Sequence, residues 1–163
     1  MKSLYLIRHV KSSWKNLTLS DFDRPLNKRG KIDAPLMAEL LKQKNIKPDL
    51  IIASPSYRTR KTAQIIASKI GYDKNEIIYF ESLYHATLTT LIDAIKYLDD
   101  RYENVFLVGH NPSINYFANE YLDFDKNIAT TGIVKVSINC LMWQDIKKEN
   151  CTLIWYEYPK KYK

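Results

Sequence analysis

Glycine, cysteine and histidine are scarce in this sequence. Its 163 residues include 4 Gly, 2 Cys and 3 His. So little glycine excludes a collagen-like repeat or a long flexible linker. Cys140 and Cys151 cannot form a disulfide framework, and their spacing matches no metal motif. We therefore expect two free thiols in a reducing compartment.

Long apolar runs are also missing. No stretch approaches the ~20 residues of a membrane span. The apolar N-terminus is interrupted by Arg8 before it could form a signal-peptide core. These absences predict a cytoplasmic protein with no membrane partner. The length and the 45% apolar content predict a single domain over residues 1–163.

The charge is unbalanced toward the basic side. Lys and Arg number 25 against 18 Asp and Glu, which gives a net charge of +7. A basic balance is compatible with phosphorylated substrates, nucleic acid or acidic lipid, although surface charge that only aids solubility is the simpler interpretation. No RNP, zinc-finger or GXXG pattern supports nucleic acid as a partner.

Apolar runs alternate with segments of helical periodicity. The runs predict buried strands at 4–7, 50–53, 77–80 and 105–108. The periodic segments predict helices at 31–44, 62–70, 88–98 and, after an N-cap at Asn111 and a first-turn Pro112, up to about 121. Pro35 either begins or bends the first helix. After Gly132 the pattern becomes β-rich, so residues 134–138 and 152–156 are expected to pair as a hairpin. This order predicts an α/β protein, a three-layer α/β/α sandwich with a mainly parallel central sheet.

Polar residues, most of them histidine or arginine, follow three of the predicted strands. Arg8 and His9 follow the first, Ser54 and Arg58 the second, and His110 the strand that ends at Val108. In open α/β sheets, ligands bind beyond the carboxyl ends of the strands. We therefore expect two imidazoles and two guanidiniums to meet at one edge of the sheet.

This set of side chains suits phosphoryl transfer. Arginine pairs with phosphate oxygens through two parallel hydrogen bonds. A neutral imidazole can attack phosphorus and carry the phosphoryl group, while a second one donates a hydrogen bond to an oxygen in the transition state. The helix expected after Asn111 would add backbone N–H donors. The arginines supply positive charge, so we expect no metal and no cofactor.

Three motifs in this order resemble the histidine phosphatase superfamily, which includes the phosphoglycerate mutases. They are Leu6-Ile7-Arg8-His9-Val10, Ser54-Pro55 followed by Arg58 and Thr62-Ala63, and Val108-Gly109-His110-Asn111. The resemblance implies a phosphoglycerate mutase-like fold with His9 as the phosphorylated nucleophile. It also implies that Arg8 and Arg58 are phosphate ligands and that His110 contacts the transferring phosphoryl group.

Within the superfamily the sequence is most similar to the short SixA-like phosphohistidine phosphatases. The likeness extends from Lys2 to Lys160 and includes the run 8–14, Asp23-Arg24-Pro25-Leu26, Arg29-Gly30, Asp33-Ala34-Pro35, Leu83-Tyr84-His85-Ala86, His110-Asn111-Pro112 and Trp143. Besides the four catalytic candidates, the residues expected to bind substrate are Lys11, Ser12, Lys15, Arg24, His85 and Asn111.

The sequence departs from the superfamily pattern in three places. Val10 replaces the usual Gly or Ala, and a branched side chain there could narrow the pocket. Lys15 stands where mutases often carry a phosphate-binding Asn. The Glu that serves mutases as general acid after a Leu is missing: His85 stands near that position and Glu81 precedes Leu83. The general acid could therefore be His85, Glu81 or none.

The missing acid bears on the substrate. A general acid contributes about 10²–10⁴-fold when the leaving group is poor, but imidazole is a good leaving group. We therefore expect a phosphatase that acts on phosphohistidine in a protein or on another activated phosphoryl donor. The alternatives are a phosphatase or mutase for a small phosphorylated metabolite, and a phosphate- or phosphohistidine-binding module without catalysis.

Overall fold

The computed structural model describes residues 1–10, 13, 15–16 and 18–163. Two of the predicted substrate-binding residues, Lys11 and Ser12, lie outside the described residues. Within them, no helix is both long and apolar enough to cross a membrane.

One mixed sheet forms the centre of the molecule, in the order β3-β2-β4-β1-β5-β6. Strands β1, β2, β3 and β4 are mutually parallel, and β5 runs antiparallel to both β1 and β6. The strands are β1 (Lys2–Arg8), β2 (Leu50–Ala53), β3 (Ile78–Tyr79), β4 (Asn104–Gly109), β5 (Ile133–Ile138) and β6 (Cys151–Glu157). The predicted parallel centre and the C-terminal hairpin are both confirmed.

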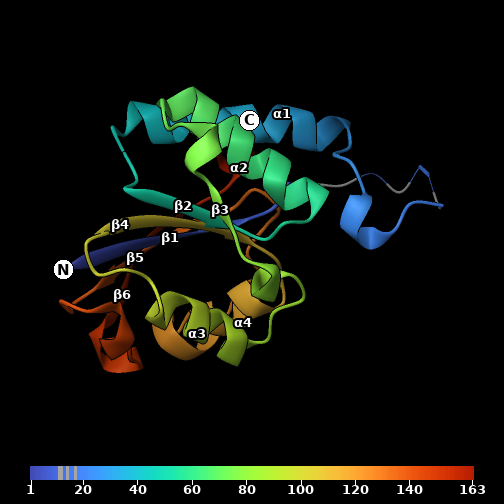
Figure 1. Ribbon diagram of the computed structural model, residues 1–163. Helices are drawn as coiled ribbons and strands as arrows, with labels where there is room; N and C mark the ends of the chain where they lie inside the picture. The colour runs from blue at the N-terminus through green and yellow to red at the C-terminus, as the bar shows by residue number, and fades with distance from the viewer. Residues whose placement is uncertain (11–12, 14, 17) are drawn as a thin grey trace.

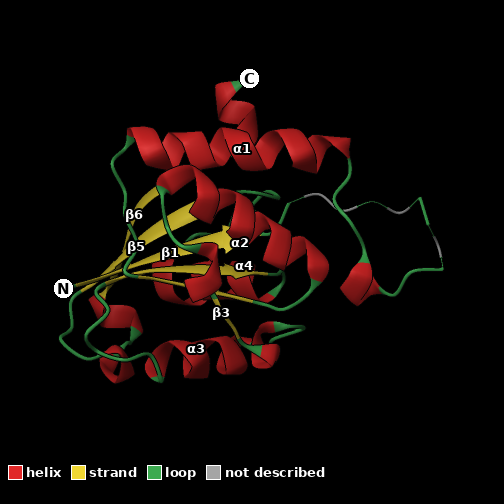
Figure 2. Cartoon of the chain, turned by 45° about the horizontal axis from the view of Figure 1, so that its top comes forward, coloured by secondary structure: helices red, strands yellow, loops and turns green. Residues whose placement is uncertain are grey.

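Helices cover both faces of this sheet (Figure 1). They are α1 (Lys28–Gln43), α2 (Tyr57–Ile70), α3 (Leu88–Lys96) and α4 (Ser113–Leu122). On one face Tyr5 and Ile7 of β1 pack with residues of α1 and α2. On the other, Leu4 and Leu6 pack with residues of α3 and α4. Because both faces are buried, the central strands are continuous apolar runs. Figure 2 shows the resulting three layers, with α1 and α3 on opposite sides of the sheet.

Several helix starts differ from the predicted ones, and a side-chain cap explains that of α1. Helix α1 begins at Lys28, where the Asn27 side chain accepts a hydrogen bond from the Gly30 amide at 2.8 Å. Pro35 lies inside this helix and does not begin it. The predicted start of the last helix is wrong: α4 begins at Ser113, and Pro112 is the residue before it. The Asn111 side chain nevertheless accepts a hydrogen bond from the Asn115 amide at 3.1 Å.

Candidate active site

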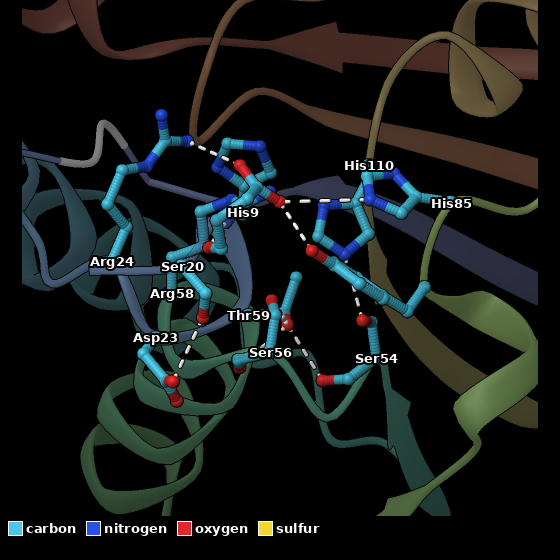
Figure 3. A network of polar contacts seen from close by, with 12 residues as sticks. His9, Ser20, Asp23, Arg24, Ser54, Ser56, Arg58, Thr59, His85 and His110 are labelled. Carbon is cyan, nitrogen blue, oxygen red and sulfur yellow. Dashed lines mark hydrogen bonds and ion pairs between the residues drawn. The ribbon is translucent and has the colours of Figure 1, made fainter. Parts of the chain in front are cut away.

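The carboxyl ends of β1, β2 and β4 lie side by side, and a polar residue follows each of them. Arg8 pairs with Gly109 across β1 and β4, and Ala53 pairs with Val108 across β2 and β4. This register places His9, Ser54 and His110, the next residues along each strand, at one edge. The rings of His9 and His110 have their centroids 5.2 Å apart. Figure 3 shows these side chains together with Arg58 of α2.

His9 is held through one ring nitrogen, and none of the described residues hydrogen-bonds to the other. Its Nδ1 lies 2.6 Å from the carbonyl oxygen of Val10. Because a carbonyl can only accept a hydrogen bond, Nδ1 carries the proton and Nε2 keeps its lone pair in the neutral ring. Burial lowers the pKa of His9 to about 4; the hydrogen bond to Val10 opposes this shift, and the charges of Arg58, Arg8 and Arg24 add to it. His9 is therefore neutral near pH 7, the form that can act as a nucleophile.

His110 is buried and hydrogen-bonded. Its Nε2 lies 2.8 Å from the Ser54 hydroxyl oxygen. Burial, together with the nearby His9, Arg58 and His85, lowers the pKa of His110 to about 3, with the Asp21 carboxylate opposing the shift. The ring is neutral and carries one proton, so when the Ser54 hydroxyl donates to Nε2 that proton lies on Nδ1 and is available to a ligand.

Arg58 contacts the carboxylate of Asp21, a residue that the sequence did not identify as part of the site. Its Nη2 lies 3.0 Å from Oδ2 of Asp21, and its Nη1 donates to the Asp21 carbonyl oxygen at 2.6 Å. Arg24 pairs with Oδ1 of the same carboxylate at 3.1 Å. Tyr84 donates its hydroxyl to Oδ2 at 2.6 Å, and Nε2 of His85 lies 3.9 Å from that oxygen. We call these five residues the Asp21 cluster.

The Asp21 carboxylate is ionised in this setting. Burial alone would raise the pKa of Asp21, but the hydrogen bonds from Tyr84 and Arg58 and the charges of Arg58 and Arg24 outweigh it and lower the pKa to about 2. Burial, together with that same hydrogen bond, raises the pKa of Tyr84 to about 12. Tyr84 is therefore a donor to a carboxylate, and Asp21 is an anion held by two guanidiniums where a phosphate could be held.

Arg8 is the last residue of β1 and directly precedes His9. Its Nη1 donates to the carbonyl oxygen of Ile128 at 2.7 Å. Its Nε is buried and has no hydrogen-bond partner among the residues that the structure describes. Burial lowers the pKa of Arg8, with Tyr156 opposing the shift. Val10 is fully buried in a small cluster with Leu26 and Ala34, so its branched side chain contributes to the core.

Of the other residues predicted to bind substrate, some lie in the Asp21 cluster and others do not. Arg24 is buried in the Asp21 cluster, and His85 lies at its exposed rim with the ring centroid 4.0 Å from that of Tyr84. Asn111 follows His110, but its amide nitrogen is directed to the Ile128 carbonyl oxygen at 3.3 Å. Lys15 and Glu81 are exposed, and the side chain of neither forms an ion pair or hydrogen bond within the described part of the chain.

The residues missed from the sequence are Asp21, Ser54 as a partner of His110, and Tyr84 as a donor. Asp21 lies two residues before the Asp23-Arg24-Pro25-Leu26 motif, in the short 3-10 helix Asp21–Asp23. Nothing in the sequence distinguishes it from Asp23, whose carboxylate accepts from Ser20. Among the described residues, no group of three His, Cys, Asp or Glu side chains could hold a metal ion.

The comparisons with known proteins agree with this geometry. The profile described as histidine phosphatase superfamily (branch 1) matches residues 4–84. An uncharacterised protein of Mycobacterium tuberculosis is 31% identical over 165 residues, which cover 94% of this chain and 100% of that protein. The chain belongs to the histidine phosphatase superfamily. An uncharacterised chloroplastic protein of Arabidopsis thaliana is 33% identical over 118 residues, 68% of this chain and 54% of its own length, so the match spans about half of that relative.

A solved structure extends the likeness to the whole chain. The SixA candidate phosphohistidine phosphatase from Agrobacterium tumefaciens superposes with a TM-score of 0.81 and 27% identity, covering 97% of this chain and 98% of that one. The predicted superfamily and the phosphoglycerate mutase-like fold are confirmed. Together the superfamily and the SixA-like structure support phosphatase activity.

Proposed function

We propose that this protein hydrolyses phosphohistidine on a protein substrate through a phosphorylated His9. The observation that carries the proposal is the state of the carboxylates. Asp21 is ionised with a pKa lowered to about 2, and Glu81 is exposed without a polar side-chain contact. An ionised Asp21 cannot serve as the protonated carboxyl group that a poor leaving group such as an alkoxide requires, and no contact within the described residues positions the Glu81 side chain for that role. Imidazole leaves without such help, because solvent can protonate it before the P–N bond breaks.

Anion binding comes first in this proposal. The substrate phosphoryl group replaces the Asp21 carboxylate between Arg58 and Arg24, an exchange of one anion for another. The guanidinium of Arg58 is buried, so its hydrogen bonds to a phosphoryl oxygen form away from bulk water. Arg8 adds positive charge near the reacting phosphorus. When the Ser54 hydroxyl donates to Nε2 of His110, the proton on Nδ1 is left to donate to a third oxygen as negative charge shifts there in the transition state.

The transfer step then uses the free nitrogen of His9. The Nε2 lone pair forms the N–P bond, and the electron pair of the substrate P–N bond leaves with the substrate histidine, which departs protonated. The Val10 carbonyl oxygen, 2.6 Å from Nδ1, stabilises the positive charge that develops on the His9 ring. In the second step, water attacks phosphorus and loses a proton to solvent. The N–P electron pair returns to Nε2, and inorganic phosphate is released.

A substrate panel tests this function. The protein is incubated with a phosphohistidine peptide, a phosphoserine peptide and glycerol phosphate. We expect kcat/KM for the phosphohistidine peptide to exceed the other two by about 10²-fold or more, the scale of a missing general acid. Turnover should be accompanied by an acid-labile phosphoryl label on His9.

Two variants accompany the panel. His9→Ala should abolish both turnover and label. His85→Ala, which removes the exposed histidine at the rim of the Asp21 cluster, should keep the label. Equal rates on the three substrates would favour the alternative of a phosphatase for small metabolites, and turnover by His9→Ala would rule out the covalent mechanism.

A further inference from the structure

A cationic cavity lies beside the carboxyl end of β1, and the described residues that line it include no member of the Asp21 cluster. Its volume is about 600 Å³, within the range of small-ligand sites. Four basic side chains line it, from Arg8, Arg29, Lys126 and Lys160, and the rings of Tyr156 and Tyr158 contribute apolar surface. No acidic residue belongs to its lining in the part of the chain that the structure describes. We call it the Lys126 pocket.

The pocket is joined to both catalytic histidines through the segment 127–131. The Ile128 carbonyl oxygen accepts from Arg8, which precedes His9, and from Asn111, which follows His110. The Thr131 amide lies 3.0 Å and 3.1 Å from the carbonyl oxygens of Arg8 and His9. Tyr156 fixes the same segment by accepting from the Ala129 amide at 2.9 Å. The pocket and the catalytic edge therefore share Arg8 and the segment that holds the backbone of both histidines in place.

The positive charge of the pocket is largely uncompensated. Lys126 and Lys160 form no ion pair with any described carboxylate, and Nε of Arg8 is buried without a hydrogen-bond partner. Arg29 has a partner, Asp33, at 3.5 Å. Several cations brought together without a carboxylate raise the local potential and favour an anionic ligand.

We propose that the Lys126 pocket binds a second anionic group of the substrate, a carboxylate or phosphate. This inference rests on the proposed function, because it assigns the substrate's phosphoryl group to His9. The anion has two sources: an acidic side chain close to phosphohistidine in a protein, or a second acid group on a small phosphorylated molecule. Both present the same chemistry to Lys126 and Lys160.

Two matched substrate pairs separate these sources. The first is a phosphohistidine peptide with Glu on both sides of the phosphohistidine, against the same peptide with Gln. The second is N-acetyl-phosphohistidine, which has a free carboxylate, against its methylamide. The acidic member of at least one pair should have a kcat/KM about three- to tenfold higher, the range for partly exposed charge pairs. A preference within the peptides alone assigns the pocket to protein substrates, and one within the small pair alone to small acids.

A double variant with a charge-matched control tests the residues. Lys126→Ala with Lys160→Ala should bring the acidic-to-neutral ratio to about one. Lys47→Ala with Lys96→Ala removes the same charge from exposed positions before β2 and at the end of α3. This control should keep the wild-type ratio. Equal rates within both pairs, an unchanged ratio in Lys126→Ala/Lys160→Ala, or an equal loss in the control would overturn the proposal.

The neutral substrates and a binding measurement keep the two proposals distinct. Hydrolysis of the neutral members reports on the proposed function alone. If no substrate is hydrolysed, that function fails, and the subsite is judged by titrating the unphosphorylated Glu and Gln peptides, N-acetylhistidine and its methylamide into the protein. Tighter binding of an acidic member that is lost in Lys126→Ala/Lys160→Ala supports the subsite. Equal binding within both pairs contradicts it.

Discussion

Two basic regions adjoin the strand ends that carry His9 and His110, and they differ in whether their cations already contact a carboxylate. In the Asp21 cluster, two guanidiniums and a phenol converge on one carboxylate at 2.6–3.1 Å. In the Lys126 pocket, two lysines have no described carboxylate partner, and a buried guanidinium nitrogen has no hydrogen-bond acceptor. The first region can bind substrate only by exchanging anions, whereas the second can bind one without displacing another. The first therefore suits the phosphoryl group, for which geometry matters most, and the second suits a looser electrostatic contact.

Removing Arg58 from the Asp21 cluster should have the largest effect on activity. Arg58→Ala leaves the phosphoryl group without a buried two-point ligand, and kcat/KM for a phosphohistidine peptide should fall about 10²–10³-fold, as when a transition-state donor is lost. Arg58→Lys keeps the charge but not the fork, so its activity should lie between. Thermal unfolding of both variants checks the fold. Wild-type activity in a folded Arg58→Ala protein would remove Arg58 from the site.

Acid should protonate the His9 ring before it protonates the Asp21 carboxylate. Burial, opposed by the Val10 hydrogen bond and reinforced by three arginines, lowers the pKa of His9 from 6.5 to about 4, whereas the pKa of Asp21 is lowered to about 2. The neutral, nucleophilic ring should therefore persist as the pH falls to about 5 and be lost through about 4. Imidazole NMR signals, with that of His9 assigned through His9→Asn, measure this without an acid-labile substrate. A His9 midpoint near 6.5 would contradict the burial of the ring.

Replacing the Asp21 carboxylate by an uncharged amide should make the Asp21 cluster resemble the Lys126 pocket, in which no described acidic residue competes with a bound anion. In Asp21→Asn the competing anion is gone, so inhibition by orthovanadate or inorganic phosphate should tighten about tenfold. Asp23→Asn is the matched control, since the Asp23 carboxylate accepts from the Ser20 hydroxyl and is exposed. It should leave the inhibition constant within about twofold. Weaker inhibition of Asp21→Asn would mean that the carboxylate positions the arginines and does not compete with the ligand.

The smallest expected effect is that of added salt, which should weaken binding at the exposed Lys126 pocket more than at the Asp21 cluster. Raising the ionic strength from about 50 mM to about 500 mM shortens the screening length to a few ångströms and weakens exposed charge interactions first. The KM of the Glu-flanked peptide should then rise about two- to threefold more than that of the Gln-flanked peptide. This difference should vanish in Lys126→Ala/Lys160→Ala. An identical salt dependence for both peptides would place the acidic residues outside the Lys126 pocket.

Much of the fold could be predicted from the sequence because burial leaves a periodic or continuous pattern. The runs at 4–7, 50–53 and 105–108 all lie within strands that helices cover on both faces. The run at 77–80 forms only the two-residue strand β3, at the edge of the sheet. Helix starts were harder to predict: α2 begins at Tyr57, five residues before the apolar periodicity from which it was predicted.

The site was predictable only in part, since polar contacts between distant residues leave no periodic pattern. The strand-end rule gave His9, Arg58 and His110, which the structure brings together. The Asp21 carboxylate meets Arg58 from 37 residues away and Tyr84 from 63. Such contacts depend on how a short 3-10 helix folds over the strand ends. The Lys126 pocket similarly combines residues of β1, α1, the segment before β5 and the end of the chain.

The hydrogen bond between His9 and the Val10 carbonyl has a stereochemical consequence. With Nδ1 occupied by that contact, a phosphoryl group transferred to His9 as proposed would be attached only at Nε2, so the covalent intermediate would be a single positional isomer, 3-phosphohistidine. The substrate is under no such restriction, because its imidazole only departs. Phosphorus NMR of the trapped enzyme would therefore show one resonance, whichever isomer of the substrate had been supplied.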